Sequence, residues 1–272
     1  MNEKSSNGPG AGGGTPLSSR YGAELYAALR EATTVAPLSA RDASLSIDDA
    51  YAISLSVLGR RMADGEKVVG KKIGVTSRVV QEMLGVHQPD FGFLTDRMHV
   101  GERIDIAQHR LIQPRAEAEI AFILKKGLSG KAVTAQDVLD ATESIAPCFE
   151  IVDSRIEGWR IGIADTVADN ASCGVFVLGE ARADPRKHDL ASLLVTVSKN
   201  GRPLSQGYGS AVQGSPAEAV AWLANTLGTY GVSLEAGDVV LSGSLVPLEP
   251  VVRGDLFEMH LHGIGRCAAR FV

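Results

Sequence analysis

Three glutamates in two apolar stretches are the residue types from which a metal site is built. Glu117 and Glu119 lie in residues 114–122, and Glu150 lies in residues 148–155. Both stretches alternate apolar with polar residues, which predicts β-strands in which residues i and i+2 share one face. Half-buried carboxylates repel one another and cost free energy unless a cation neutralises them. Such oxygen ligands suit Mg²⁺ or Mn²⁺.

A second interpretation of these glutamates needs no metal. In it, Glu117 and Glu119 lie on an exposed strand edge, and Glu150 pairs with Arg155 or Arg115. Spacing alone does not separate the two interpretations, because any strand places residues i and i+2 on one side, whether buried or solvent-facing.

Lys72 is a candidate for proton transfer or for holding an anion. It lies between Gly70 and Gly74 in an apolar run that predicts a strand over residues 68–75. Glycines in a strand let a ligand or another backbone approach closely. Burial lowers the pKa of a lysine and a neighbouring carboxylate raises it. The alternative is a surface lysine whose ammonium reaches solvent, as we expect for Lys71.

Asp90 is the second candidate for acid–base chemistry. It lies in a predicted loop, residues 87–92, where an aspartate is either catalytic or a turn residue. Two further predicted loops carry polar groups that could reach a ligand. Residues 165–172 follow an apolar stretch, and residues 242–244 could offer backbone N–H and hydroxyl donors to an anion.

Composition places the chain among ordinary globular proteins of 272 residues, with 44% hydrophobic and 22% charged residues. A net charge of −5 argues against nucleic acid as a partner, and no apolar run reaches the length of a membrane span. Residues 1–16 are rich in Gly and Ser and predict a disordered tail. Cys148, Cys173 and Cys267 are widely spaced in apolar sequence, which predicts buried free thiols and a cytoplasmic protein.

The elements predicted around these residues make an α+β fold of one catalytic domain, residues 17–272. Its first part, residues 17–100, is mainly helical, with Ser46 as the N-cap of one helix. Its second part, residues 101–272, is β-rich and includes a hairpin at Asn200-Gly201. We expect N-terminal helices followed by a largely antiparallel sheet that rolls up and closes on itself.

Six motifs in order resemble the signatures of the hydratase/decarboxylase family of the fumarylacetoacetate-hydrolase-like superfamily. The resemblance extends over residues 21–272, and the motifs that carry it are residues 70–77, 84–92, 114–122, 150–155, 165–172 and 241–245. Within the family, the motifs are most similar to the branch that hydrates 2-hydroxypenta-2,4-dienoate.

The resemblance implies a role for each candidate residue. It implies that Mg²⁺ or Mn²⁺ is held by Glu117, Glu119 and Glu150. It also implies that Lys72 and Asp90 form the acid–base pair. Second candidates, for orienting the substrate carboxylate or a water, are Asn170, Ser172 and Ser244.

The activity implied by the resemblance is hydration of 2-hydroxypenta-2,4-dienoate to 4-hydroxy-2-oxopentanoate, in the meta-cleavage degradation of aromatic compounds. The family also implies a homo-oligomer and association with a pathway decarboxylase. Two alternatives stay open. One is the decarboxylation of 2-oxo-3-hexenedioate at the same metal site, and the other is a non-catalytic partner subunit, against which the intact set of acidic residues argues.

Overall fold

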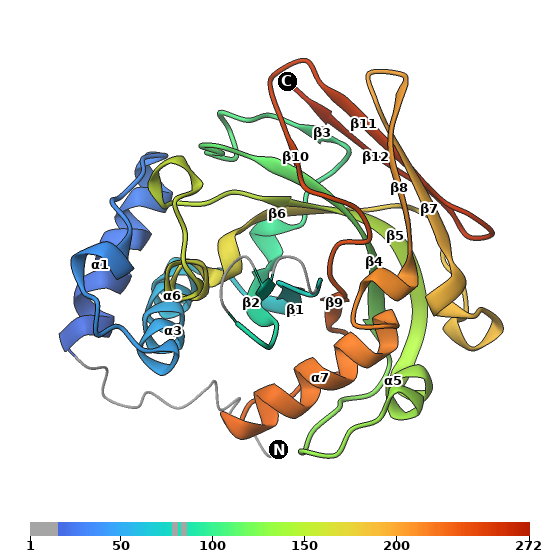
Figure 1. Ribbon diagram of the computed structural model, residues 1–272, viewed down its shortest axis with the longest axis horizontal. Coiled ribbons are helices and arrows are strands. Elements are labelled where there is room, and N and C mark those ends of the chain that lie inside the picture. Colours follow the sequence, from blue (N-terminus) through green and yellow to red (C-terminus); the bar gives the residue numbers. More distant parts are fainter. Residues whose placement is uncertain (1–15, 78–80, 83–85) are drawn as a thin grey trace, which may run out of the picture.

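The larger of two β-sheets carries every strand that contributes to the candidate site (Figure 1). The computed structural model describes residues 16–77, 81–82 and 86–272. In this part of the chain, the sheet has the strand order β2-β1-β9-β4-β5-β6, with β10 paired to β4. Its strands are β1 (Val68–Gly74), β2 (Asp90–Thr95), β4 (Arg115–Leu124), β5 (Thr142–Val152), β6 (Cys173–Leu178), β9 (Val239–Leu241) and β10 (Glu249–Pro250).

The smaller sheet packs against β5 and β6 of the larger one. Its order is β3-β12-β11-β7-β8, and the ring of Phe257 in β11 meets that of Phe149 in β5 edge-on at 6.3 Å. Pairing is antiparallel except for β1–β9 and β3–β12, which confirms the expected largely antiparallel fold. The strands are β3 (Arg103–Ile104), β7 (Leu194–Lys199), β8 (Arg202–Tyr208), β11 (Leu256–Leu261) and β12 (Gly265–Phe271).

The larger sheet rolls up until its two edge strands, β2 and β6, approach each other. Just after β2, the N–H of Val100 donates to the carbonyl of Phe176 in β6 at 3.0 Å. The side chain of Asn170, which lies just before β6, also bonds the backbone of Phe93 in β2. The expected rolled-up sheet is therefore confirmed, and the roll has an inner face on which side chains of distant strands meet.

Helices surround the sheets, and those near the site form one group. In Figure 1, α3 lies between α1 and the central strands, with α6 beside it, while α7 runs along the opposite side. The helices are α1 (Pro16–Glu31), α2 (Leu38–Arg41), α3 (Ile47–Ala63), α5 (Ala135–Ala141), α6 (Ile163–Ala168) and α7 (Pro216–Thr229). Single 3₁₀ turns are η1 (Asp96–Met98), η2 (Glu157–Trp159), η3 (Asn170–Ser172), η4 (Pro185–Lys187), η5 (Leu190–Ser192) and η6 (Gly209–Ala211).

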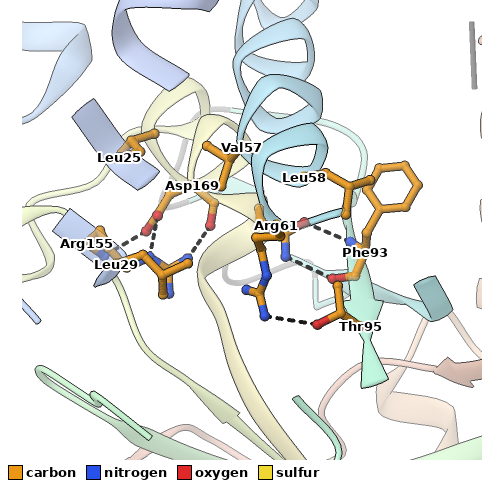
Figure 2. Close-up of a pocket in the computed structure, with 10 residues that line it drawn as sticks. Leu25, Leu29, Val57, Leu58, Arg61, Phe93, Thr95, Arg155 and Asp169 are labelled. Carbon is orange, nitrogen blue, oxygen red and sulfur yellow. Dashed lines mark hydrogen bonds and ion pairs between the residues drawn. The ribbon is translucent and has the colours of Figure 1, made fainter. Parts of the chain in front are cut away.

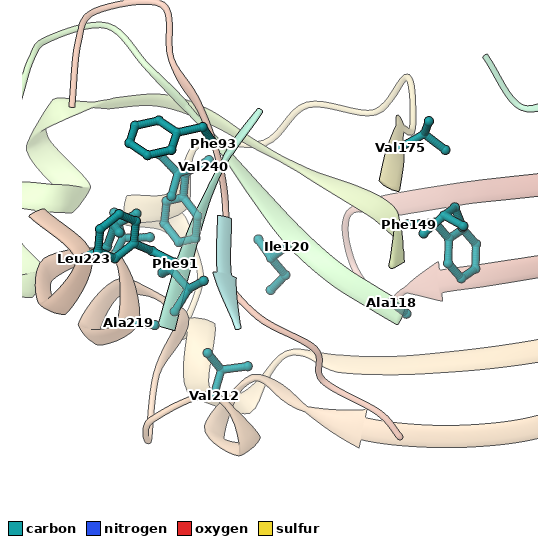
Figure 3. Packing of buried hydrophobic residues seen from close by; sticks show 14 of the residues in the cluster. Phe91, Phe93, Ala118, Ile120, Phe149, Val175, Val212, Ala219, Leu223 and Val240 are labelled. Carbon is teal, nitrogen blue, oxygen red and sulfur yellow. The ribbon is translucent and has the colours of Figure 1, made fainter. Parts of the chain in front are cut away.

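The two faces of the larger sheet differ in character. One face belongs to the main apolar core, where Ile120 of β4, Val240 of β9 and Leu223 of α7 are buried together (Figure 3). The inner face carries a smaller apolar cluster consisting of Leu94, Met98, Ala121, Cys148, Cys173, Phe176 and Leu241. The polar candidates project from this second face.

Several local predictions are confirmed. Ser46 caps α3 in a capping box with Asp49, and Asn200-Gly201 joins β7 to β8 with positive φ at both residues. The three cysteines are free and buried. Within the described residues, no helix combines the length and apolar character needed to cross a bilayer. The predicted tail, residues 1–16, lies outside the described residues except for Pro16, which begins α1.

Two loop predictions near the site are wrong. Asp90 is not in a loop but is the first residue of β2, which is buried along its whole length. Residues 165–172 are not a loop either, because α6 and η3 cover most of them. Their polar side chains bond to residues far away in the chain, which allows a polar sequence to form a buried helix.

Candidate metal centre and active site

Strand register brings the three glutamates together. Glu117 of β4 lies directly opposite Glu150 of β5, and Glu119 lies two residues further along β4. Residues opposite each other in a sheet, and residues two apart in a strand, share a face. One carboxylate oxygen from each glutamate lies within 4.8 Å of the other two. Glu119 and Glu150 are fully buried, and Glu117 is half-buried.

The carboxylate oxygens of this group lack the hydrogen bonds that buried oxygens normally have. Among the described residues, Glu119 Oε1 and both oxygens of Glu150 have no hydrogen-bond partner. Glu119 Oε2 accepts the backbone N–H of Gly243 at 2.8 Å. Buried carboxylate oxygens that accept no hydrogen bond are costly, and the one ammonium near them in the part of the chain that the structure describes, that of Lys72, balances one of the three charges. A dication among the glutamates would balance the remaining two. The residues therefore fit a hard divalent ion.

Burial raises the pKa of two of the glutamates, Glu117 and Glu119. Burial, reinforced by the charge of Glu150, raises the pKa of Glu117 to about 8. The same causes raise the pKa of Glu119 well above its ordinary value. Glu117 and Glu119 therefore favour their protonated forms, and a cation in their midst reverses that preference. Metal and protons therefore compete for this group.

Lys72 joins the same face from β1. Its neighbour on β9 is Leu241, which pairs in turn with Ala121 of β4. Ala121 is two residues from Glu119, so Lys72 lies on the same face of the sheet as Glu119. The Lys72 ammonium is buried, and its Nζ lies 3.2 Å from Glu150 Oε1, at ion-pair distance. Burial alone would lower the pKa of Lys72, but the charges of Glu150 and Asp90 outweigh burial and raise it. Lys72 is therefore a fixed positive charge.

Lys71 differs from the expectation of a surface lysine. It is buried, and its Nζ lies 2.5 Å from Asp238, as the partner in a buried ion pair on the other face of β1. The expected pairing of Glu150 with Arg155 or Arg115 is also wrong, because the cation at ion-pair distance from Glu150 is Lys72. Of the two arginines considered, Arg155 bonds Asp169, and Arg115 stacks over the ring of Trp159 at 4.4 Å.

Asp90 faces Lys72 across Gly74. Asp90 and Gly74 are paired in the β1–β2 register. A Cβ on Gly74 would lie 2.2 Å from Asp90 Oδ1 and 3.2 Å from Lys72 Nζ, so glycine alone leaves room for both groups. Asp90 Oδ1 has no hydrogen-bond partner among the described residues. Burial raises the pKa of Asp90, and the charge of Lys72 only partly offsets this effect.

Thr166 is a further residue beside Asp90 that was not among the predicted site residues. Its hydroxyl on α6 donates to Asp90 Oδ2 at 3.5 Å and lies 3.3 Å from the hydroxyl of Ser172. Thr166 lies within the motif of residues 165–172, but the loop prediction gave no reason to aim it at Asp90. Helical spacing would have given no reason either, because all five residues from Ala164 to Ala168 are buried and α6 shows no solvent-facing side there.

The second candidates for substrate binding are placed differently. Ser172 lies in the hydroxyl pair with Thr166 beside Asp90. Asn170 uses its whole amide on Phe93, accepting its N–H at 2.8 Å and donating to its carbonyl at 2.9 Å. The Ser244 hydroxyl donates to the carbonyl of Val246 at 2.7 Å. The side chains of Asn170 and Ser244 thus bond to backbone groups of the protein. Substrate contact by any of these three residues stays a prediction.

A buried ion pair anchors the turn that carries Ser172. Arg155 Nε donates to Asp169 at 2.6 Å, and its guanidinium also bonds the carbonyls of Asp153 and Cys173. Figure 2 shows Arg155 and Asp169 facing each other beside a cavity near α1 and α3. That cavity has a volume of about 10 Å³, room for about one water molecule. This cavity is too small to hold a substrate.

A larger cavity of about 320 Å³ opens on the other side of Asp90. Its lining comes from α3, α6 and the segment before β2, and consists of Ile47, Tyr51, Val86, His87, Gln88, Pro89, Asp90, Ile163 and Val167. Asp90 therefore belongs both to this cavity, which we call the apolar chamber, and to the charged cluster around Lys72. With a dication at the carboxylate cluster, a small acid anion could bind there, and Asp90 beside it could carry a proton.

The chain is similar in sequence and fold to proteins of known activity. A 2-hydroxyhexa-2,4-dienoate hydratase of Comamonas testosteroni is 60% identical over 92% of this chain and 96% of its own length. A 2-hydroxypent-2,4-dienoate hydratase of Pseudomonas putida is 59% identical over 80% of this chain and 98% of its own. Among solved structures, 4-oxalocrotonate decarboxylase from Pseudomonas putida G7, complexed with magnesium and adipate, superposes with a TM-score of 0.90.

That decarboxylase is 32% identical, and the match covers 94% of this chain and 97% of the other. The profile of the fumarylacetoacetate (FAA) hydrolase C-terminal family matches residues 67–272. This range contains all the strands of both sheets and every candidate site residue. The resemblance inferred from the motifs is thus confirmed, and the chain belongs to the fumarylacetoacetate hydrolase C-terminal family.

Proposed function

We propose that the chain is a hydro-lyase that adds water to 2-hydroxypenta-2,4-dienoate, the enol of 2-oxopent-4-enoate, and releases 4-hydroxy-2-oxopentanoate. The supporting observation is the buried cluster of three carboxylates within 4.8 Å, with Lys72 3.2 Å from Glu150. Relatives at 59% and 60% identity that carry hydratase names support the same activity. Such a reaction belongs to the meta-cleavage breakdown of aromatic compounds.

Glu117, Glu119 and Glu150 are the proposed ligands of Mg²⁺ or Mn²⁺. When bound, a dication of this type supplies a Lewis acid for the 2-oxygen and carboxylate of a 2-oxo acid. The protein adds a fixed charge, because the ammonium of Lys72 lies beside the same carboxylates and attracts the anionic end of the substrate. The glutamates and Lys72 together set the orientation of that end.

Asp90 is the proposed proton carrier at the carbon chain. No group in the described part of the chain bonds its Oδ1, and its pKa is raised, which suits a carboxylate that both accepts and returns a proton. In the first step, the proton of the 2-hydroxyl moves to C5, and the dienol becomes a 2-oxo-3-enoate. In the second step, water adds at C4, the electrophilic end, and its remaining proton goes to C3. Ser172 and Thr166 lie beside Asp90, where a water could be oriented.

The test is direct turnover of the dienol by purified protein. Loss of its ultraviolet absorbance in the presence of Mg²⁺ or Mn²⁺, with 4-hydroxy-2-oxopentanoate as the product, supports the proposal. Glu119→Gln keeps the side-chain volume and the acceptor for the Gly243 N–H but removes a charged ligand. We expect this variant to fold, to bind metal more weakly and to lose nearly all turnover. Full activity of the variant at saturating Mg²⁺ contradicts the assignment.

Decarboxylation is the second candidate, favoured by the TM-score of 0.90 to 4-oxalocrotonate decarboxylase. Its substrate carries a second carboxylate, and release of CO₂ from 2-oxo-3-hexenedioate, measured in parallel, separates the two activities. A protein that binds metal but turns over neither substrate would be the non-catalytic partner subunit. Light scattering of the chain alone and mixed with the pathway decarboxylase tests the expected homo-oligomer and the expected complex.

A further inference from the structure

The outer face of the smaller sheet carries two histidines side by side at the end of β11. Three residues of this strand, Phe257, Met259 and Leu261, are buried in the main core. Because side chains alternate along a strand, His260 and His262 project from the opposite face. His260 is half-buried and His262 is exposed. The carboxylate cluster belongs to β4 and β5 of the larger sheet, so the two histidines lie outside it (Figure 1).

The two imidazole rings lie close together beside one residue of the neighbouring strand. Their centroids are 4.1 Å apart, with 32° between the ring planes. Thr196 of β7 is paired with His260 in the register, yet its hydroxyl lies 3.1 Å from Nε2 of His262. Both rings therefore approach Thr196. Two nitrogens that bind one ion at about 2.0–2.1 Å each are at most about 4.2 Å apart, a span that rings at this separation can provide.

The surroundings of His260 and His262 favour neutral imidazole, which is the form that binds metals. Partial burial, with further contributions from His262 and Arg266, lowers the pKa of His260 below its ordinary value of 6.5. His260 is therefore mostly uncharged at neutral pH. The ring of His262 can donate its Nε2–H to Thr196, which leaves Nδ1 with the lone pair that a metal needs. Metal-binding histidines usually hold a partner of this kind with their second nitrogen.

The charges beside the pair decide which cations it can take. Arg266 of β12 is paired with His260 in the register and is exposed. Glu258, two residues before His260 on the same face, is exposed as well and partly offsets the charge of Arg266. Mg²⁺ prefers oxygen ligands and keeps much of its water shell, so two imidazoles beside an arginine give it no site. Cu²⁺, Ni²⁺ and Zn²⁺ bind imidazole nitrogen, and salt screens the repulsion from an exposed arginine.

We propose that His260 and His262 form a second metal site, which binds Cu²⁺, Ni²⁺ or Zn²⁺ through one nitrogen of each ring. Water completes the coordination, and Thr196 is a positioning residue that holds the ring of His262. The site lies on the smaller sheet and is not needed for the proposed hydration. Because its ligands are imidazoles, its affinity should rise from Mn²⁺ through Ni²⁺ to Cu²⁺, and Mg²⁺ should not compete for it.

The first test is calorimetric titration of the Mg²⁺-loaded protein with Ni²⁺. We expect His260→Asn and His262→Asn each to weaken Ni²⁺ binding by about 100-fold, and Thr196→Val to weaken it by about tenfold, as when a metal-binding histidine loses its partner. Any step in which Ni²⁺ displaces Mg²⁺ from the glutamates is common to all these variants. His188→Asn is the matched control, because it removes a half-buried histidine beside η4 and should leave the binding unchanged. Full Ni²⁺ binding by both variants of the pair overturns the proposal, as does an equal loss in the control.

The second test identifies the ligand atoms. Electron paramagnetic resonance of the Glu119→Gln protein with one equivalent of Cu²⁺ avoids competition from the carboxylate cluster. We expect coupling of the copper signal to two imidazole nitrogens, and to one when either His260 or His262 is also replaced by Asn. Arg266→Gln removes the opposing charge and should tighten Cu²⁺ binding severalfold at low salt, with a smaller gain at high salt. Nitrogen coupling that survives the loss of both histidines overturns the site.

Mg²⁺-dependent turnover of the dienol separates this site from the proposed function. We expect His260→Asn to keep that turnover while it loses Ni²⁺ binding. Ni²⁺ binding at the pair in a protein that hydrates no dienol supports the second site and rejects the proposed function. Turnover that falls in step with Ni²⁺ binding in His260→Asn and His262→Asn contradicts a site that is separate from the reaction.

Discussion

Lys72 and Asp90 are two opposite charges that the fold keeps beside the carboxylate cluster. The ammonium balances Glu150 at 3.2 Å, while Gly74 leaves space between Lys72 and Asp90. In the proposed function, the charge of Lys72 attracts the substrate without being a metal ligand itself. Metal binding and turnover should therefore respond differently when Lys72 is changed.

We expect Lys72→Ala to lower kcat by about 10²–10³-fold, the usual effect of removing one preorganised electrostatic group from an active site. Metal binding should persist or tighten, because Glu150 loses its competing cation. Equilibrium titration with Mn²⁺, together with steady-state rates at saturating metal, measures the two effects separately. Loss of metal together with activity would show that Lys72 mainly holds the site together.

We expect Thr166 to act on the proposed reaction through Asp90. Its hydroxyl donates to Asp90 Oδ2 and so lowers the pKa of Asp90 against the effect of burial. Thr166→Val removes the donor and should raise that pKa, so more Asp90 is protonated at a given pH. We expect the acidic limb of the kcat/KM profile to move to higher pH in Thr166→Val and to return in Thr166→Ser. An unmoved limb in the valine variant contradicts this role.

At the scale of elements, the turn after α6 is the feature that closes the larger sheet. Asn170, Ala171 and Ser172 all have φ between 51° and 56°, in the left-handed region. Each non-glycine residue there costs on the order of 1 kcal/mol. The contacts of Asn170 with Phe93 and of Asp169 with Arg155 hold the turn in this conformation.

We expect Asn170→Ala to destabilise the fold by about 1–3 kcal/mol, because the buried N–H and C=O of Phe93 lose their partners. Thermal unfolding measures this effect as a fall in Tm of several degrees. KM should change little in the folded fraction. A raised KM with unchanged Tm would instead support the substrate-binding role that the resemblance implies for Asn170.

Local pattern predicted the elements better than it predicted their partners. The two-residue period of β4 placed Glu117 and Glu119 on one face, but only the β4–β5 register places Glu150 opposite Glu117. The loop prediction for residues 165–172 failed because Asp165 and Asp169 are polar, and sequence does not show that Ser39 and Arg155 bind them inside the fold. Long-range partners decided both cases, and spacing carries no information about them.

At the scale of the whole molecule, the rolled sheet encloses acidic groups that the unfolded chain exposes to water. Between their ordinary pKa near 4.5 and the value of about 8 for Glu117, the folded protein binds more protons than the unfolded chain. Glu119 shifts in the same direction. Stability must therefore fall as the pH rises through this range, because deprotonation favours the state with the lower pKa. A bound dication favours the ionised carboxylates and therefore removes the cause of this loss of stability.

We accordingly expect the Tm of the metal-free protein to decrease between pH 5.5 and pH 8.5, by about 2–4 °C for each kcal/mol lost. Excess Mg²⁺ or Mn²⁺ should flatten this decrease, with the larger stabilisation at the higher pH. Glu119→Gln removes one of the buried acids and should weaken both the pH dependence and the metal response. Glu143→Gln, an exposed change on the same strand as Glu150, is the control and should preserve both. A metal-free Tm that rises across this pH range would show that the three glutamates are already paired within the protein.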